Sequence, residues 1–239
     1  MPAPSTTPIA TPTPTAMPTE AARLRLFQLV SPALPVGAFS YSEGLEVLVQ
    51  RGALPDAAAV GAWLQAELQR GAVAVEAAAL QPLQRAVAAA DQAAATALDG
   101  WLLAQREAAE LRAQQRQMGQ SLLQLLADLG WPLPPALAAA GLAWPAAFAW
   151  AAHCLALESP AIEEAYLYGW VANQLSAAVR LVPLGPTQAQ RLQLQLAELI
   201  AARAAALAAA DPHNLWNGGV GAGLAQLQHA ELYSRLFRS

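Results

Sequence analysis

Few side chains in this sequence could bind a metal ion, and they are far apart. The sequence contains three histidines, His153, His213 and His229, and a single cysteine, Cys154. No histidine has another three or four residues away, which is the spacing that lets one face of a helix bind zinc. His153 and Cys154 are neighbours, so a helix directs their side chains to different sides. We therefore expect this chain to hold no metal or cofactor of its own, and we interpret the pair as core residues.

Ser40 and Glu43 are the residues that most invite a catalytic interpretation. Ser40 does not lie in a G-x-S-x-G motif, and no histidine is near it in the sequence. The three-residue spacing is also that of a capping box, in which a serine and a glutamate open a helix. We interpret Ser40 as a helix cap and predict no catalytic residue. An uncharacterised enzyme that uses Ser40 or Glu43 is the alternative.

A glycine-rich segment near the C-terminus shares only its glycines with phosphate-binding loops. Residues 218–223 read Gly-Gly-Val-Gly-Ala-Gly, but no predicted strand precedes them and no Gly-Lys-Ser/Thr follows. All 13 of the Lys and Arg residues are arginines, so the chain cannot supply the lysine that a P-loop needs. Residues 214–223 are expected to form a flexible connector.

The composition of the chain indicates which partners it can bind and in which cellular compartment it is found. Charged residues make up 13% of the chain, the formal net charge is -4, and the arginines form no basic cluster. Nucleic-acid binding depends on such clusters, so we expect no nucleic-acid partner. The single cysteine cannot form an internal disulfide, which favours a reducing compartment, and we expect a cytoplasmic protein.

The hydrophobic content raises the question of a membrane. Hydrophobic residues make up 56% of the chain, and its mean hydropathy is +0.30. Residues 129–157 carry no formal charge, and a membrane span needs about 20 apolar residues. We nevertheless predict short buried helices and no membrane, with a membrane-peripheral helical interaction protein as an alternative. The breaks in this segment are Pro132, Pro134, Pro135, Gly141 and Pro145.

Helix breakers and apolar periodicity together predict an all-α protein. Prolines interspersed with threonines over residues 1–20 predict a disordered tail. Residues 21–239 are predicted to form one helical bundle of about ten helices, because a single core can reach roughly 250 residues. Asp91 is expected to be an N-cap, and Pro55 and Asp56 are expected to start a helix. Helices are expected over residues 21–30, 41–51, 72–90, 106–129, 144–157, 160–182, 187–210 and 224–237, with one more from Pro55 and Asp56 to Gly71 and another after Asp91.

Two of these helices carry informative patterns. In the helix over 106–129, leucines and one methionine trace a single apolar stripe, and Arg106 is expected to pair with Glu110 on the outer side. The helix over 160–182 is apolar on two faces. A helix covered on both faces lies inside a bundle, so this one is predicted to be central.

The segment over residues 29–46, which we name the elbow, differs most from the rest of the chain. Pro32 and Pro35 restrict its backbone, and Gly37 permits conformations that other residues resist. The elbow is therefore predicted to be a rigid turn that positions Phe39 and Tyr41. These residues alone leave two possibilities equally open, a core position or a recognition surface.

The C-terminal residues are unusually apolar for a chain end. Four large apolar residues lie within positions 232–239, whereas a free end normally frays. Arg235 and Arg238 suit the negative end of a helix dipole. We predict that this segment docks, either onto this chain or onto another.

Four segments resemble, in order, the urease accessory protein F family (UreF). The first is the elbow, LVSPALPVGAFSYSEGLE, and the last is LYSRLFRS over residues 232–239. Between them lie ELR at 110–112, followed by QMG at 117–119, and AAVRLVPLG at 177–185. The resemblance extends over residues 24–239.

The resemblance implies an all-α protein that is not an enzyme. Members of this family form homodimers and bridge two other accessory proteins, UreD (UreH in some systems) and the nickel-binding GTPase UreG. The assembly inserts nickel into apo-urease, and the F component is proposed to control the GTPase and to form part of the nickel route. By this resemblance the complex handles the nickel, and this chain is not clearly a nickel-binding protein.

The resemblance also implies which surfaces meet the partners. The C-terminal residues would dock into UreD/UreH, with the elbow near Tyr41 close to that contact. Tyr168 and Arg180 would face the GTPase and the second protomer. Phe39 is expected to pack inward and Tyr41 to face the partner. The residues expected to bind partners are Tyr41, Glu43, Tyr168, Arg180, His229, Tyr233, Arg235, Leu236, Phe237, Arg238 and Ser239.

Overall fold

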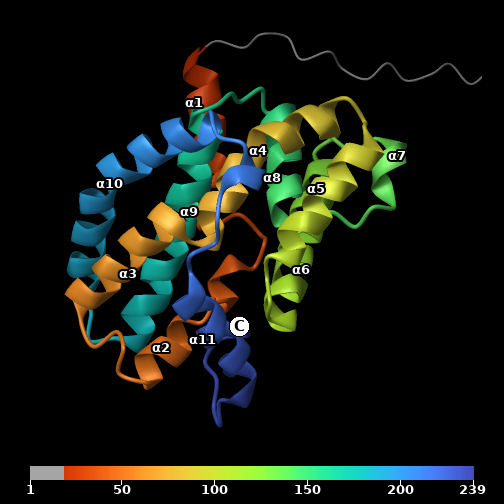
Figure 1. The fold of residues 1–239 in the computed structure, drawn as a ribbon. Helices are drawn as coiled ribbons and strands as arrows, with labels where there is room; N and C mark the ends of the chain where they lie inside the picture. Colours follow the sequence, from red (N-terminus) through yellow and green to blue (C-terminus); the bar gives the residue numbers. More distant parts are fainter. Residues whose placement is uncertain (1–18) are drawn as a thin grey trace, which may run out of the picture.

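Every regular element in the described part of the chain is a helix (Figure 1). The computed structural model describes residues 19–239, and the predicted all-α bundle of about ten helices is confirmed. The predicted disordered tail lies outside the described residues up to position 18; residues 19 and 20 belong to the first helix. The α-helices are α1 (Thr19–Leu29), α2 (Leu45–Gln50), α3 (Ala57–Arg70), α4 (Ala72–Ala88), α5 (Gln92–Ala104), α6 (Ala109–Asp128), α7 (Pro135–Ala138), α8 (Trp144–Cys154), α9 (Ala161–Leu181), α10 (Pro186–Ala208) and α11 (Val220–Gln228). Three short 3-10 helices are η1 (Ala38–Ser40), η2 (Pro212–Asn214) and η3 (His229–Glu231).

Aspartates cap two helices, and the cap at Asp91 was predicted from the sequence. Asp56 Oδ1 accepts a hydrogen bond from Ala59 N at 2.9 Å at the start of α3, and Asp91 Oδ1 accepts one from Ala94 N at 3.0 Å at the start of α5. Each carboxylate satisfies a main-chain N–H that has no partner within the helix. These caps fix where the two helices begin.

The capping-box prediction for Ser40 and Glu43 is wrong. Ser40 ends the short helix η1, and α2 begins only at Leu45, after Gly44, with no side-chain cap. Gly44 adopts a left-handed φ of 89° and Glu43 a φ of 53°. The chain turns here instead of starting a helix because the amides of residues 42 and 43 bond to the C-terminal residue.

Helix α4, not α9, is the most enclosed helix of the bundle. Every residue from Ala72 to Leu80 is buried, and α4 packs against α3, α5, α8, α9 and α10. In Figure 1 it starts near the middle of the molecule, between α9 and α8. Its small alanine side chains let neighbouring helices approach closely on several sides. Helix α9 was predicted to be central, and it does bury Ile162 and Val171, but Tyr168 is exposed.

Arg106 does not form the predicted surface pair with Glu110. It lies before α6 and is 4% exposed, and its Nε and one terminal nitrogen donate to Glu76 Oε1 of α4 at 3.0 and 2.6 Å. The hydroxyl of Tyr166 in α9 donates to the other Glu76 oxygen at 2.9 Å. Burial raises the pKa of Glu76, and Arg106 opposes that shift. This buried network joins α4 and α9 to the segment before α6.

The C-terminal region departs from the predicted helix over 224–237. Helix α11 begins earlier, at Val220, and regular helix ends at Glu231. Residues 220–223 of the predicted flexible connector lie in α11 instead, and Gly218 N donates to Arg70 O at the end of α3 at 2.6 Å. A Cβ on Gly219 would lie 2.9 Å from Glu67 Oε2, so a larger residue there would require the Glu67 side chain to move.

The described residues include no helix that is both long enough and apolar enough to cross a membrane. They also contain no group of three or more His, Cys, Asp or Glu side chains placed to hold a metal ion. His153 and Cys154 are half-buried, and the ring of His153 stacks against Trp150 with 5.3 Å between the ring centroids.

Gly119 allows α6 to approach the start of α8 closely. A Cβ at this position would lie 2.6 Å from Leu142 O and 2.7 Å from Ala143 C. Asp99 of α5 holds the same segment, because its Oδ1 accepts a hydrogen bond from Ala143 N at 3.0 Å. Main-chain atoms cannot rotate away as side chains can, so a larger residue at position 119 must separate the two helices.

We predict that Gly119→Ala lowers the free energy of unfolding by about 1–3 kcal/mol, the usual cost of overpacking. Urea denaturation followed by circular dichroism measures the change. Gly100→Ala in α5 is the matched control, because a Cβ there meets no atom within 4 Å. The control is expected to be neutral or stabilising by about 0.5–1 kcal/mol. Equal effects of the two substitutions would contradict the close contact.

Candidate binding site at the C-terminus

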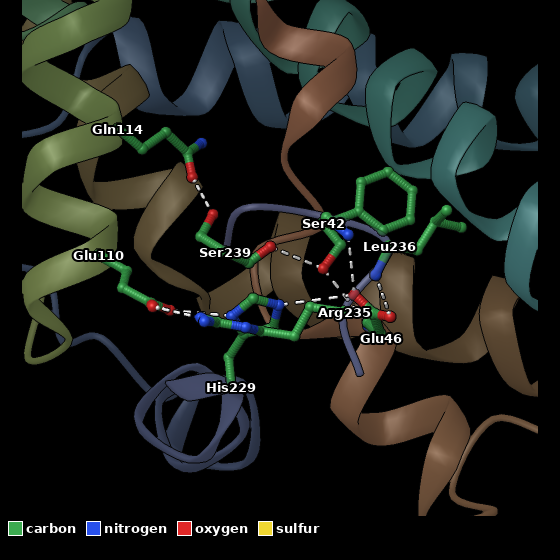
Figure 2. Close-up of polar contacts among 9 residues, drawn as sticks. Ser42, Glu46, Glu110, Gln114, His229, Arg235, Leu236 and Ser239 are labelled. Carbon is green, nitrogen blue, oxygen red and sulfur yellow. Dashed lines mark hydrogen bonds and ion pairs between the residues drawn. The ribbon is translucent and has the colours of Figure 1, made fainter. Parts of the chain in front are cut away.

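The main-chain oxygen of Ser239 lies in a pocket of hydrogen-bond donors from the elbow (Figure 2). It accepts hydrogen bonds from Ser42 N at 2.8 Å, from Glu43 N at 3.1 Å and from the Ser42 hydroxyl at 2.7 Å. The hydroxyl of Ser239 donates to Gln114 Oε1 of α6. Both serines are fully buried. The last residue is thus held by the elbow on one side and by α6 on the other.

Glu46 binds the main chain of two neighbouring residues near the C-terminus, Leu236 and Phe237. Its carboxylate oxygens accept from Leu236 N at 2.8 Å and from Phe237 N at 3.1 Å, and Arg238 N donates to Ser40 O at 2.9 Å. A carboxylate that accepts two main-chain N–H groups makes charge-assisted bonds, which are stronger than neutral ones. We name residues 232–239 the C-terminal segment; its last four residues run along the elbow and α2.

A second carboxylate joins this segment to α6 (Figure 2). Glu110 Oε2 lies 2.8 Å from His229 Nδ1, and Glu110 Oε1 accepts from Arg235 at 2.9 Å. His229 is fully buried, and its Nε2 lies 3.5 Å from Glu46 Oε2 without making a hydrogen bond. An ionised carboxylate only accepts, so Nδ1 carries the hydrogen in the pair with Glu110. His229 therefore lies between the two carboxylates that hold the C-terminal segment.

Arg180 of α9 covers the aromatic end of the segment. Its guanidinium carbon lies 4.4 Å from the centre of the Phe237 ring, a cation–π contact. The same side chain donates to Phe39 O at 3.3 Å. Phe237 is 5% exposed. Arg180 thus connects the C-terminal segment and the elbow to the end of α9.

The exposures of Phe39 and Tyr41 are the reverse of those predicted. Phe39 is 68% exposed, whereas Tyr41 is 5% exposed. The Tyr41 hydroxyl donates to Gln117 Oε1 at 3.2 Å, and Asn173 donates to its main-chain oxygen. The turn through η1 directs Phe39 outward. The hydrogen bond of the Tyr41 hydroxyl to Gln117 offsets the cost of burying that polar group.

Glu43 is an internal link in the elbow. It is 7% exposed, and its two carboxylate oxygens accept from Gln114 at 2.8 Å and from the indole of Trp170 at 3.0 Å. A φ of 53° is unfavourable for a residue with a Cβ. These hydrogen bonds to α6 and α9 offset that cost and hold the turn in place.

The eleven predicted partner-binding residues divide into two groups by exposure, and their role toward partners stays a prediction. Five are buried within this chain and make the contacts described above, so in this structure their side chains do not form a surface: Tyr41, Glu43, His229, Phe237 and Ser239. The six that reach the surface are Tyr168, Arg180, Tyr233, Arg235, Leu236 and Arg238.

Sequence reasoning did not assign a site role to four residues that hold the segment: Ser42, Glu46, Glu110 and Gln114. Glu46 offered one signal, because it interrupts the apolar residues 45–49. A charged side chain on an otherwise buried helix face needs a partner. Which partner it has depends on a segment about 190 residues later, which no local pattern indicates.

Comparison with known proteins decides the family. Residues 54–197 match the family model UreF. The chain belongs to the UreF family. It is 42% identical over 219 residues to the urease accessory protein UreF of Alkalilimnicola ehrlichii, covering 91% of this chain and 96% of that protein. It is also 42% identical to the protein of that name from Thermosynechococcus vestitus, covering 92% and 99%, and 40% identical to that from Dechloromonas aromatica, covering 90% and 96%.

Glu67 of α3 is a buried carboxyl group with a shifted pKa. Burial raises the pKa of Glu67 to about 7, and the nearby Arg106 partly opposes the shift, while Glu43 adds to it. Glu67 is 8% exposed and lies against Gly71 and Gly219. The Glu67 carboxyl therefore lies beside residue 219, the last residue before α11.

We predict that Glu46→Ala frees the last residues of the chain. Leu236 N and Phe237 N lose their only acceptor, so their amides should exchange with solvent deuterium at least tenfold faster, because one charge-assisted hydrogen bond contributes about 1.5–3 kcal/mol. Hydrogen exchange measured by mass spectrometry on C-terminal peptides tests this. Glu198→Ala on the exposed side of α10 is the control and should leave exchange unchanged. Unaltered protection in Glu46→Ala would show that Glu46 does not hold the segment.

Glu67 should make folding stability depend on pH. Between about pH 4.5 and 7 the unfolded chain loses this proton while the folded chain keeps it, so the folded state binds more protons and its stability falls as pH rises. The pKa shift corresponds to a loss on the order of 3 kcal/mol. Glu67→Gln should remove that share of the slope in urea titrations at several pH values, and Glu198→Gln should not. Parallel stability curves for Glu67→Gln and the parent would contradict the raised pKa.

Proposed function

We propose that this chain is a cytoplasmic, non-catalytic scaffold for urease maturation. It bridges a UreD/UreH-like accessory protein and a UreG-like GTPase, so that the complex delivers nickel to apo-urease. It acts as a homodimer and modulates the GTPase by binding. Three UreF relatives at 40–42% identity, which match at least 90% of this chain and bear the name urease accessory protein, support this proposal.

The carrying observation is the way the C-terminal segment is held. Ser239 and Phe237 are buried while Tyr233 and Leu236 are 106% and 52% exposed. The segment therefore presents apolar side chains from a backbone that is already fixed. A fixed backbone loses little conformational entropy when a partner binds, which favours affinity. This arrangement fits docking to the UreD/UreH-like protein.

The composition of the surrounding surface fits protein recognition. Phe39 is exposed beside Arg180, and Arg235 and Arg238 reach the surface near the exposed Leu236. Aromatic and arginine side chains are enriched among the residues that contribute most to binding energy. Helix α11 adds an exposed apolar row at spacings of four and three, formed by Val220, Leu224 and Leu227.

The position of Arg180 supports binding of the UreG-like GTPase along α9. It contacts Phe237 and the main chain of Phe39 and stands at the end of α9, the helix that also exposes Tyr168. A partner bound along α9 would meet a residue that already contacts the C-terminal segment. Binding of the GTPase to α9 would therefore change the contacts of the C-terminal segment, which binds the UreD/UreH-like protein in this proposal.

The double variant Tyr233→Ala/Leu236→Ala tests the docking assignment. Both side chains are exposed, so the fold should persist, while binding to purified UreD/UreH should weaken at least tenfold if they are central contacts. Affinity measured by biolayer interferometry gives the answer, with thermal unfolding as a check on the fold. Leu194→Ala, which removes a 75% exposed leucine of α10, is the matched control. Equal affinities for the double variant and the control would refute docking through this surface.

A further inference from the structure

A pocket of about 190 Å³ lies beside the first turns of α11. The end of α3, the start of α4 and residues 105–107 form the rest of its wall. A Cβ on Gly219 would lie 2.9 Å from Glu67 Oε2, and a Cβ on Gly223 would lie 3.6 Å from Glu107 Oε2. Gly223 N donates to Gly219 O at 2.9 Å, so the two glycines are one helical turn apart. Two carboxylates therefore lie beside the same glycine-lined face of α11.

Glu67 lines this pocket without a partner of its own. The side chain belongs to a residue that is 8% exposed, and within the described part of the chain it accepts no hydrogen bond and forms no ion pair. Of the residues that line the pocket, only Arg106 is cationic, and its guanidinium donates to Glu76 instead. A buried carboxylate normally has a charged or hydrogen-bonded partner. Glu67 therefore offers a bound group an acceptor that is not already in use.

The charges around the pocket favour a cation that carries N–H donors. Glu107 is exposed and adds a second carboxylate at the mouth. The first-turn amides of α11 carry only about half a positive charge, which offsets part of the two carboxylates. Ionised carboxylates accept hydrogen bonds and cannot donate them. A guanidinium group supplies both the charge and a planar fork of N–H donors that matches a carboxylate.

Apolar side chains form the rim of the pocket. Val220 and Leu224 line it and are 66% and 53% exposed. The methylene stem of an arginine can lie against such a rim while its charged end reaches the carboxylates, whereas a free small cation leaves the rim uncovered. An apolar cavity of about 150 Å³ holds benzene, which is similar in size to an arginine side chain beyond its Cβ. The pocket therefore has room for that side chain.

We propose that this pocket binds an arginine side chain of a partner protein. The guanidinium donates to the carboxylates of Glu67 and Glu107, and the stem packs against Val220 and Leu224. The surface of the partner around that arginine is apolar, because it covers the exposed rim. The proposal does not depend on the scaffold role, since neither Tyr233 nor any other residue of the C-terminal segment lines the pocket.

Isothermal titration calorimetry of the full chain at pH 8 with three probes tests the site. A capped Leu-Arg-Leu peptide is expected to bind. The same peptide with citrulline, which has the shape of arginine without its charge, should bind at least tenfold more weakly, because charge-assisted hydrogen bonds are lost. Methylguanidinium, which has no stem, should also bind more weakly than the arginine peptide.

Two results with these probes would overturn the proposal. The first is failure of the arginine peptide to bind at millimolar concentration, or its binding no more tightly than the citrulline peptide. The second is equal binding of methylguanidinium and the arginine peptide, which would mean that the pocket takes a free small cation and that the apolar rim plays no part.

Substitutions locate the binding. Glu67→Gln should weaken the arginine peptide at least tenfold, and Glu198→Gln, on the exposed side of α10, should not. Gly223→Ala adds a methyl group to the wall in ordinary contact with Glu107, so the fold should persist while the peptide binds more weakly. Gly221→Ala is the matched control, because it lies in the same helix outside the lining and its Cβ meets no atom within 4 Å. Equal binding to these two alanine variants would place the peptide elsewhere and refute the assignment.

Binding should also depend on pH through Glu67. Burial raises the pKa of Glu67 to about 7; Arg106 and Arg70 oppose the shift, and Glu43 adds to it. Only the ionised carboxylate pairs with a guanidinium, so the arginine peptide should bind about tenfold more weakly at pH 6 than at pH 8. Glu67→Gln should remove this dependence. An affinity of the parent chain that is the same at both pH values would show that the arginine does not pair with Glu67.

Discussion

The main-chain groups of the last four residues need hydrogen-bond partners once Phe237 and Ser239 are buried, and the elbow and α2 supply them. Glu46, Ser42 and the amide of Glu43 bond to a segment about 190 residues later in the chain. A buried main-chain group without a partner costs more than a typical hydrogen bond contributes. The elbow and the C-terminal segment are therefore interdependent, and each has a defined shape only in the presence of the other. The surface formed by Phe39, Tyr233 and Leu236 depends on this pairing.

Buried charges link the site to the rest of the bundle. Glu43 bonds to α6 and α9, and Glu76 on α4 bonds to Arg106 and Tyr166. The charges of Glu43 and Glu76 both act on Arg106 and raise its pKa. A buried ion pair does not guarantee net stability, because desolvation opposes the attraction. It does require particular partners. Here the bonded residues come from the elbow, α4, the segment before α6, α6 and α9, so the network specifies how the helices meet.

Binding roles and internal roles share the same few segments. Arg180 contacts the elbow and the C-terminal segment while remaining exposed on α9. The carboxylate of Glu43 accepts hydrogen bonds from α6 and α9, and its main-chain N–H donates to Ser239 O. A change in the C-terminal segment or at the end of α9 therefore acts on contacts that both regions make with the elbow. Coupling between two bound partners requires residues that are in contact with each other across both binding surfaces. Arg180 and Glu43 provide such contacts.

The sequence by itself determined the all-α class, the cap at Asp91, the helix start near Asp56 and most helix ranges, because these depend on local propensity and on hydrogen bonds a few residues apart. It also pointed to the elbow and to a docked C-terminus, since proline, glycine and clustered apolar residues restrict the chain locally. Only the tertiary structure decided that Glu43 and Ser40 do not open a helix, that Arg106 is buried against Glu76, and that Phe39 is outside and Tyr41 inside. Each of these outcomes was set by a partner at least 30 residues away, and local periodicity contains no information about such partners.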